Sequence, residues 1–195
     1  MCFATRPIDA GWLNRWALSI ADCKLRSDIS GSSRFAGRIE KDLLWSEFGI
    51  QRSADTPLHI PPEVEAACGV IDEGFFEKVG LAWYAPVLSK LVLGPDRQRH
   101  LLPTDRTELQ FMMLFRHHIA VARLKVPTHA GDLTSAGRTC FFAWLQNTLP
   151  DGIERFCLRM PPCPEMQEVM PMAAQQAALF SSVLDRLEIV RRDAA

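Results

Sequence analysis

The feature that most constrains the fold is an uninterrupted apolar run from Phe111 to Phe115. This run covers more than one helical turn, so a helix at this point has no polar face. A helix that is apolar on every side lies inside a protein, because an exposed face would leave apolar surface in water. We therefore expect the segment from Glu108 to Ala122 to be a buried central helix.

Signals at both ends of this segment favour a long helix. Asp105 and Glu108 have the spacing of an N-terminal capping box. Lys125 and Pro127 suit the other end, because a cation is favourable there and proline cannot continue a helix. At a rise of about 1.5 Å per residue, roughly 20 residues would cross a small domain. The sequence thus predicts one central helix with the other helices packed around it.

Apolar residues recur at spacings of three and four along most of the remaining chain. Asp9 is the expected cap of the first of these helices. The helices predicted in this way cover residues 10–25, 33–47, 63–79, 80–93, 132–148 and a last segment from 172 onward. Around residues 156–160 apolar and other residues alternate, which predicts a short extended segment with one buried face. The expected fold class is all-α, an irregular multi-helix domain around one buried central helix.

The segment between Gly49 and Pro62 is rich in glycine, serine and proline, as linkers are. We predict an N-terminal helical lobe at residues 1–50, a linker at 51–62 and a main helical domain at 63–195. Within the lobe, Trp12 and Trp16 are expected in the core. The alternative is that they line a groove for a partner helix.

Charge and hydropathy exclude two classes of partner. The chain has 22 Lys and Arg against 23 Asp and Glu, so it lacks the basic excess that phosphate neutralisation requires. It also lacks a dense basic stripe, and we expect no nucleic-acid binding. No apolar run approaches the ~20 residues of a spanning helix, and no signal-peptide core is visible. We expect a cytoplasmic protein that does not insert into a membrane.

Reactive side chains form no recognisable catalytic or metal-binding pattern. The six cysteines include no CxxC pair and are expected as reduced thiols, while His117 and His118 are adjacent rather than at HExxH spacing. We expect no metal, no cofactor and no enzymatic activity. One alternative is a small all-α enzyme in which Cys140 pairs with His117 or His118. Another is a helical regulatory protein, which the charge balance disfavours.

Several short motifs resemble a known family. Ala143-Trp144-Leu145, Leu149-Pro150 and Phe156-Cys-Leu-Arg-Met-Pro161 follow one another. Together they resemble the C-terminal region of the SctK/YscK proteins of bacterial type III secretion systems, where a Trp-Leu helix precedes a basic Leu-Arg-Leu-Pro element. Here Met160 replaces the second leucine. Upstream, Leu58-His-Ile-Pro61 followed by Phe75-Phe-Glu-Lys-Val-Gly-Leu81 is similar to that family's proline-ended entry into a helix with a Leu-Gly-Leu centre.

This resemblance implies a helical, cytoplasmic, non-enzymatic protein of the sorting platform beneath the secretion basal body. Such proteins join the cytoplasmic domain of the inner-membrane ring protein, SctD, to the pods built from SctQ. The implied partners are therefore an SctD-type ring protein and an SctQ-type pod protein.

Arg155 and Arg159 are the candidate partner-binding residues. If Phe156, Leu158 and Met160 face the core, Arg159 faces outward and Arg155 joins it at the edge. A guanidinium binds a partner carboxylate with a fixed fork geometry, so charge reversal would weaken such an interface. Stability would then stay within ~0.5 kcal/mol of the parent, as for ordinary surface changes. The alternative is that both arginines are merely solvated.

Overall fold

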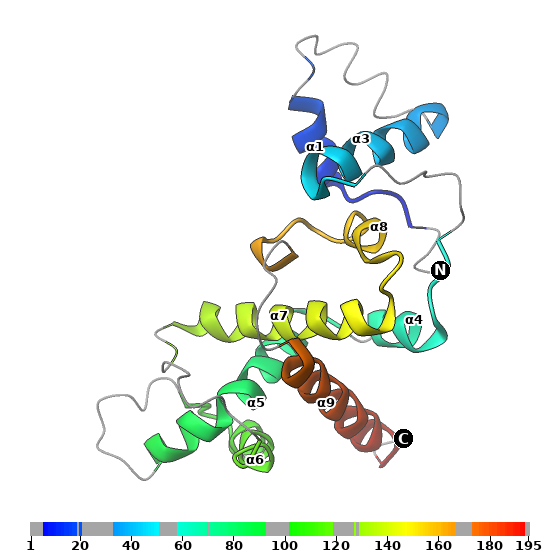
Figure 1. Ribbon diagram of the computed structural model, residues 1–195. Coiled ribbons are helices and arrows are strands. Elements are labelled where there is room, and N and C mark those ends of the chain that lie inside the picture. Colours follow the sequence, from blue (N-terminus) through cyan, green and yellow to red (C-terminus); the bar gives the residue numbers. More distant parts are fainter. Residues whose placement is uncertain are drawn as a thin grey trace. The chain divides into compact units, whose positions relative to one another are not determined.

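The computed structural model describes residues 6–18, 20, 33–50, 58–69, 71–92, 102–118, 127, 129–166 and 173–193. This part of the chain is helical and contains no strand, which confirms the all-α prediction (Figure 1). The α-helices are α1 (Ala10–Leu18), α3 (Ala36–Phe48), α4 (Pro62–Cys68), α5 (Glu73–Val92), α6 (Arg106–Leu114), α7 (Ala130–Thr148), α8 (Ile153–Cys157) and α9 (Ala173–Asp193). Two short 3-10 helices are η2 (Ser33–Phe35) and η4 (Pro164–Met166).

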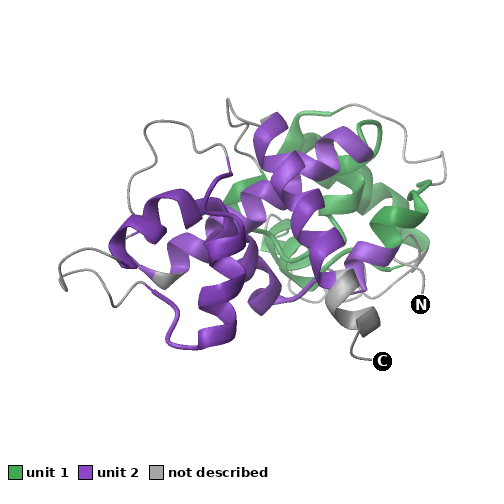
Figure 2. Ribbon diagram, turned by 90° about the horizontal axis from the view of Figure 1, so that it is seen from below, with its two compact units in different colours: residues 1–65, 149–167 green, residues 66–148, 168–195 purple. Residues whose placement is uncertain are grey.

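The chain forms two compact units (Figure 2). Unit 1 comprises Met1–Glu65 and Leu149–Gln167, and unit 2 comprises Ala66–Thr148 and Glu168–Ala195. The predicted division into 1–50, 51–62 and 63–195 differs from these units, because residues 149–167 group with the N-terminal helices. Residues 51–57 of the predicted linker lie outside the described part of the chain.

Unit 1 is organised around the buried indole of Trp12. The apolar residues buried with it are Ile39, Leu43, Leu44 and Leu158. The Trp12 Nε1–H donates hydrogen bonds to the carbonyl oxygens of Cys157 (3.2 Å) and Met160 (2.9 Å). These bonds tie α1 to the end of α8 and to the turn that follows it, where the Cys157 carbonyl also accepts from the Met160 amide (3.0 Å). The prediction that Trp12 lies in the core is confirmed, and Trp16 packs partly buried against the same cluster.

The caps and faces of the first two helices follow the sequence closely. The Asp9 carboxylate accepts a hydrogen bond from the Gly11 amide (2.8 Å), which confirms it as the cap of α1. This helix ends at Leu18, and residues 19 and 21–25 of its predicted extension lie outside the described residues. On α3 the apolar residues Ile39, Leu43 and Leu44 are buried, and Gly49 ends the helix in a left-handed conformation that favours glycine.

The segment at 156–160 is helix and turn, so the predicted extended segment is wrong. Helix α8 covers Ile153–Cys157, and the Leu158 amide still donates to the Glu154 carbonyl (3.1 Å). Three consecutive side chains, at 156–158, are buried. The alternation in the sequence therefore does not separate an inner from an outer face.

Unit 2 depends on a close crossing of α5 and α7. A Cβ atom on Gly80 would lie 1.9 Å from the carbonyl oxygen of Leu133, and one on Gly137 would lie 1.9 Å from that of Phe76. Each helix thus presents a glycine to the backbone of the other. Phe76 and Gly80 are one turn apart on α5, as are Leu133 and Gly137 on α7, and their pairing makes the crossing antiparallel.

Aromatic rings from three helices pack in the same unit. Phe180 of α9 lies 5.6 Å from Phe75, 5.4 Å from Phe141 and 5.1 Å from Trp144, measured between ring centroids. Phe180 is fully buried, as expected for an apolar residue on the inner side of the last helix. The prediction of helices at 132–148 and from 172 onward is confirmed.

The predicted central helix is wrong. Helix α6 covers only Arg106–Leu114, and Met112 is its only buried residue, whereas Leu114 is 57% exposed. The buried positions belong instead to α5 and α7, and α6 packs on the side of α5. The Asp105 cap is confirmed, since its carboxylate accepts from the Thr107 amide (3.2 Å). Residues 119–126, where the helix was expected to continue and end, lie outside the described residues.

The division of the preceding segment into helices at 63–79 and 80–93 is also wrong. Helix α4 ends at Cys68, and α5 begins after Asp72, whose carboxylate caps it by accepting from the Phe75 amide (2.7 Å). It then runs without a break to Val92, with Pro86 inside it. Residues on every side of α5 are buried, so this is the helix that occupies the core of unit 2.

Replacing Gly80 by alanine tests the crossing. We expect Gly80→Ala to lower the free energy of unfolding by about 1–3 kcal/mol or more, because the new methyl group forces the two backbones apart. Gly37→Ala on α3 is the control, since a Cβ there has no atom within 4 Å. Alanine is the better helix former, so the control should be as stable as the parent or slightly more stable. Equal urea midpoints for Gly80→Ala and the parent would contradict the close crossing.

Candidate functional site

The two arginines predicted to bind a partner point inward in unit 1. The Arg155 Nε lies 2.7 Å from Glu40 Oε1, and an Arg159 guanidinium nitrogen lies 3.7 Å from Glu40 Oε2. Arg159 also donates a hydrogen bond to the Arg155 carbonyl oxygen. The side chains are only 16%, 8% and 11% exposed for Arg155, Arg159 and Glu40. The prediction that Arg159 faces outward is therefore wrong.

This cluster joins α3 to α8 through opposite charges. Burial lowers the pKa of Arg159, and the nearby Glu40 carboxylate acts in the opposite direction. A buried cation needs such a partner, because the desolvation cost is otherwise uncompensated. The sequence held one signal for this pairing: Glu40 lies between Ile39 and Leu43 on the apolar side of its helix. A carboxylate on a buried face requires a cation from elsewhere in the chain.

Glu40→Gln tests this cluster. We expect a loss of about 3 kcal/mol or more in the free energy of unfolding, because both guanidinium groups stay buried without a counter-charge. Glu47→Gln is a matched control on the same helix. Its carboxylate lies 3.9 Å from Arg15, which is 51% exposed, and such a surface pair contributes at most ~1 kcal/mol. Chemical unfolding of both variants measures the difference, and equal losses would contradict a structural role for Glu40.

Cys140, His117 and His118, the residues of the alternative Cys–His pair, each have different contacts from those of a catalytic pair. Cys140 is fully buried, and burial raises the pKa of its thiol, whereas an activated nucleophile needs a lowered pKa. His117 is exposed and its Nε2 accepts a hydrogen bond from the Arg116 Nε (2.9 Å). The His118 ring packs on Trp83, with 5.6 Å between ring centroids. Within the described ranges no hydrogen bond joins Cys140 to a histidine.

His118 gives a pH dependence with a defined sign. Its Nε2 is buried without a hydrogen-bond partner among the described residues, and burial lowers its pKa. Below the ordinary histidine pKa of about 6.5, the unfolded chain therefore binds this proton more readily than the folded chain. The contribution of His118 to stability should fall as the pH decreases through about 6.5. Unfolding free energies measured from about pH 7.5 to 5 should fall more in the parent than in His118→Gln, and identical pH profiles would contradict this.

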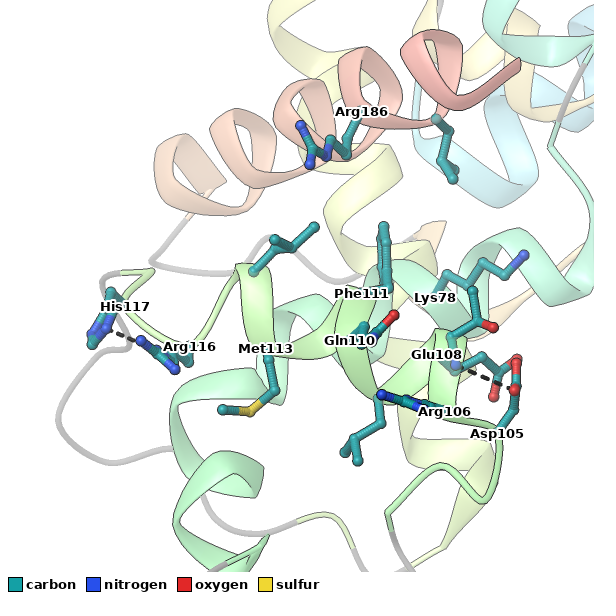
Figure 3. Close-up of a pocket in the computed structure, with 14 residues that line it drawn as sticks. Lys78, Asp105, Arg106, Glu108, Gln110, Phe111, Met113, Arg116, His117 and Arg186 are labelled. Atoms are coloured by element: carbon teal, nitrogen blue, oxygen red, sulfur yellow. Dashed lines mark hydrogen bonds between the residues drawn. The ribbon is translucent and has the colours of Figure 1, made fainter. Parts of the chain in front are cut away.

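A groove in unit 2 lies between α6, α9 and the first half of α5 (Figure 3). Its volume is about 1070 Å³. Phe111 projects from α6 into the space towards α9, which carries Arg186 on the opposite side (Figure 3). The apolar side chains that line it are Leu109, Phe111, Met113, Leu114 and Leu187. Phe111, Met113 and Leu114 belong to the apolar run at 111–115.

Cations outnumber carboxylates around this groove. The cations are Lys78, Arg106, Arg116 and Arg186, and the carboxylates are Asp105 and Glu108. Asp105 is already engaged in capping α6. Within the described part of the chain, no ion pair engages any of the four cations. The groove therefore combines apolar walls with a net positive rim.

Sequence reasoning missed this groove because it assigned the run at 111–115 to the core. An apolar run can be covered by another helix of the same chain or by a partner protein. The sequence pattern does not distinguish these two cases. Leu114 is the clearest sign of a partner, because its side chain is 57% exposed and continues the apolar lining of the groove, and contiguous exposed apolar patches mark interaction sites.

Among the described residues, no group of three or more His, Cys, Asp or Glu side chains could hold a metal ion. None of the described helices has the length and hydropathy to cross a bilayer. Comparisons with protein-family models, with curated proteins and with solved structures found no match. The resemblance to the SctK/YscK proteins thus rests on the motifs at 58–81 and 143–161.

Proposed function

We propose that this chain is a non-enzymatic adaptor of the type III secretion sorting platform. In this role it links the cytoplasmic domain of an SctD-type inner-membrane ring protein to an SctQ-type pod protein, at the cytoplasmic face of the basal body. The motifs at 143–161 support the assignment to secretion. The observation that carries the adaptor role is the apolar, positively rimmed groove beside α6.

The chemistry of the groove specifies the kind of segment that fits it. An amphipathic helix binds such a surface by placing its apolar side chains between two helices. Lys78, Arg106 and Arg186 would then face carboxylates at the edges of that helix, which favours an acidic partner segment. We infer that the groove takes an amphipathic helix of a partner, with an apolar stripe flanked by Asp or Glu.

The other candidate functions gain no support from particular residues. The buried thiol of Cys140, with its raised pKa, does not favour nucleophilic catalysis. The net charge of −1 does not favour a nucleic-acid-binding regulator. The adaptor is therefore the single function we propose.

Leu114→Glu tests the groove in a strain that carries the secretion system. The variant should fold like the parent because Leu114 is exposed, but it should bind one of the two partner proteins at least ~10-fold more weakly, as for an interface hot spot. Leu18→Glu on α1 is the control, since Leu18 is 73% exposed and lies outside the groove. Binding is measured by titration of the purified ring domain and pod protein, and secretion by assay of exported substrates.

Two results would contradict these proposals separately. Equal affinity of Leu114→Glu and the parent for both partners would remove the groove as the binding site. Normal secretion by a strain that lacks the whole protein would end the adaptor proposal.

A further inference from the structure

A second surface lies on α3 in unit 1. Arg38, Lys41 and Trp45 are spaced three and four residues apart, and Arg34 precedes them by one turn. At 100° per residue these spacings place the three α3 side chains on one stripe about 60° wide, and Arg34 lies in η2 just before it. All four residues are exposed, and the Trp45 side chain is 56% exposed. We call these four residues the α3 stripe.

The orientation of this stripe is fixed by the opposite side of the helix. Ile39 and Leu43 there are buried in the core of unit 1. Glu40 is held by its ion pair with Arg155 at 2.7 Å. Rotation of α3 to bury Trp45 would expose this core and break the ion pair. The exposure of Trp45 is therefore a consequence of how α3 is anchored.

The stripe carries three cations, Arg34, Arg38 and Lys41. No ion pair among the described residues engages Arg34, Arg38 or Lys41. Asp42 flanks the stripe one turn from Arg38, and Glu47 lies 3.9 Å from Arg15. Three cations around an exposed indole thus form a local positive surface on a chain whose net charge is −1.

We propose that the α3 stripe is a docking surface for an acidic segment of another protein. The indole of Trp45 enters an apolar hollow in that partner, and Arg38 and Lys41 bind its carboxylates. Tryptophan and arginine are the residues that most often dominate the energy of protein interfaces. The proposal adds a second contact to the adaptor and rests on the adaptor function for the identity of the partner.

The same residues argue against a lipid or nucleic-acid ligand. A helix that binds a membrane surface inserts a broad apolar face, but the apolar face of α3 is buried in unit 1, which leaves Trp45 alone to insert. Duplex DNA is bound by neutralising many phosphates, and the stripe offers three cations. An acidic protein segment needs only a few carboxylates and one apolar contact, so it fits the stripe best.

A photocrosslinking amino acid at position 42 flanks the stripe and leaves the Trp45 indole in place. Expression of this variant in the native host identifies what the stripe binds. We expect a covalent adduct with a protein segment rich in Asp and Glu, mapped by mass spectrometry. In the Arg38→Glu/Lys41→Glu background the adduct should fall at least ~10-fold. The same crosslinker at Asn14, an exposed residue of α1, reports the background. The absence of a protein adduct above that background, or an adduct that charge reversal leaves unchanged, would overturn the proposal.

A second measurement separates the ligand classes. The purified full chain is titrated with vesicles of phosphatidylcholine and phosphatidylserine and with a 20-base-pair DNA duplex, and we expect no binding that depends on Trp45 or the stripe cations. Binding that Trp45→Ala abolishes would assign the stripe to a lipid or to DNA and overturn the proposal. Thermal unfolding of every variant should match the parent, since the substituted side chains are exposed.

The identity of the crosslinked protein distinguishes this proposal from the adaptor function. An acidic segment of the ring or pod protein supports both. An acidic segment of an unrelated protein supports the docking surface alone, and the adaptor function is then decided by secretion in the strain that lacks the whole protein.

Discussion

The close contact between the backbones of α5 and α7 is the constraint on which unit 2 depends. Gly80 and Gly137 leave no room for a Cβ atom, so the two helices can approach more closely than side chains would allow. This approach brings Phe76 and Phe141 together from the two helices, with 5.7 Å between ring centroids, and Phe180 of α9 packs on Phe141. Since α5 and α7 occupy the buried positions, α6 packs on the side of α5 and keeps Leu114 exposed.

Unit 1 is held by contacts between residues that are far apart in the sequence. Trp12 donates to the carbonyl oxygen of Met160, and Arg155 pairs with Glu40. The first contact satisfies a carbonyl in the turn that follows α8, and the second pairs charges that would otherwise be buried without a counter-charge. They explain why the segment that follows α7 belongs with the N-terminal helices. They also explain why the first residues of the family-like motif, at 156–158, are buried.

Each unit presents a surface of its own with the same two properties. The groove of unit 2 and the α3 stripe of unit 1 both combine exposed apolar side chains with cations that lack counter-charges among the described residues. Two such surfaces would allow the proposed adaptor to bind two acidic partners. The anchored sides of α3 and α6 keep these residues at the surface, so the apolar area is available without a conformational change.

The sequence alone determined the properties that depend on near neighbours. Helical spacing gave the fold class, and short polar side chains such as Asp9 and Asp105 marked the starts of helices, because a cap bonds to amides only two residues away. The inner faces of α3, α7 and α9 followed from the same spacing. The resemblance to a secretion family also came from the sequence.

Only the tertiary structure decided which apolar segment is central and which charges are internal. An apolar run such as 111–115 shows that a helix is apolar, but not whether another helix covers it. The alternation at 156–160 likewise predicted an outward Arg159, whereas Glu40, more than 100 residues away, draws it inward. In both cases the deciding contacts join distant parts of the chain. Local patterns carry no information about such contacts, because they describe a segment without its neighbours in space.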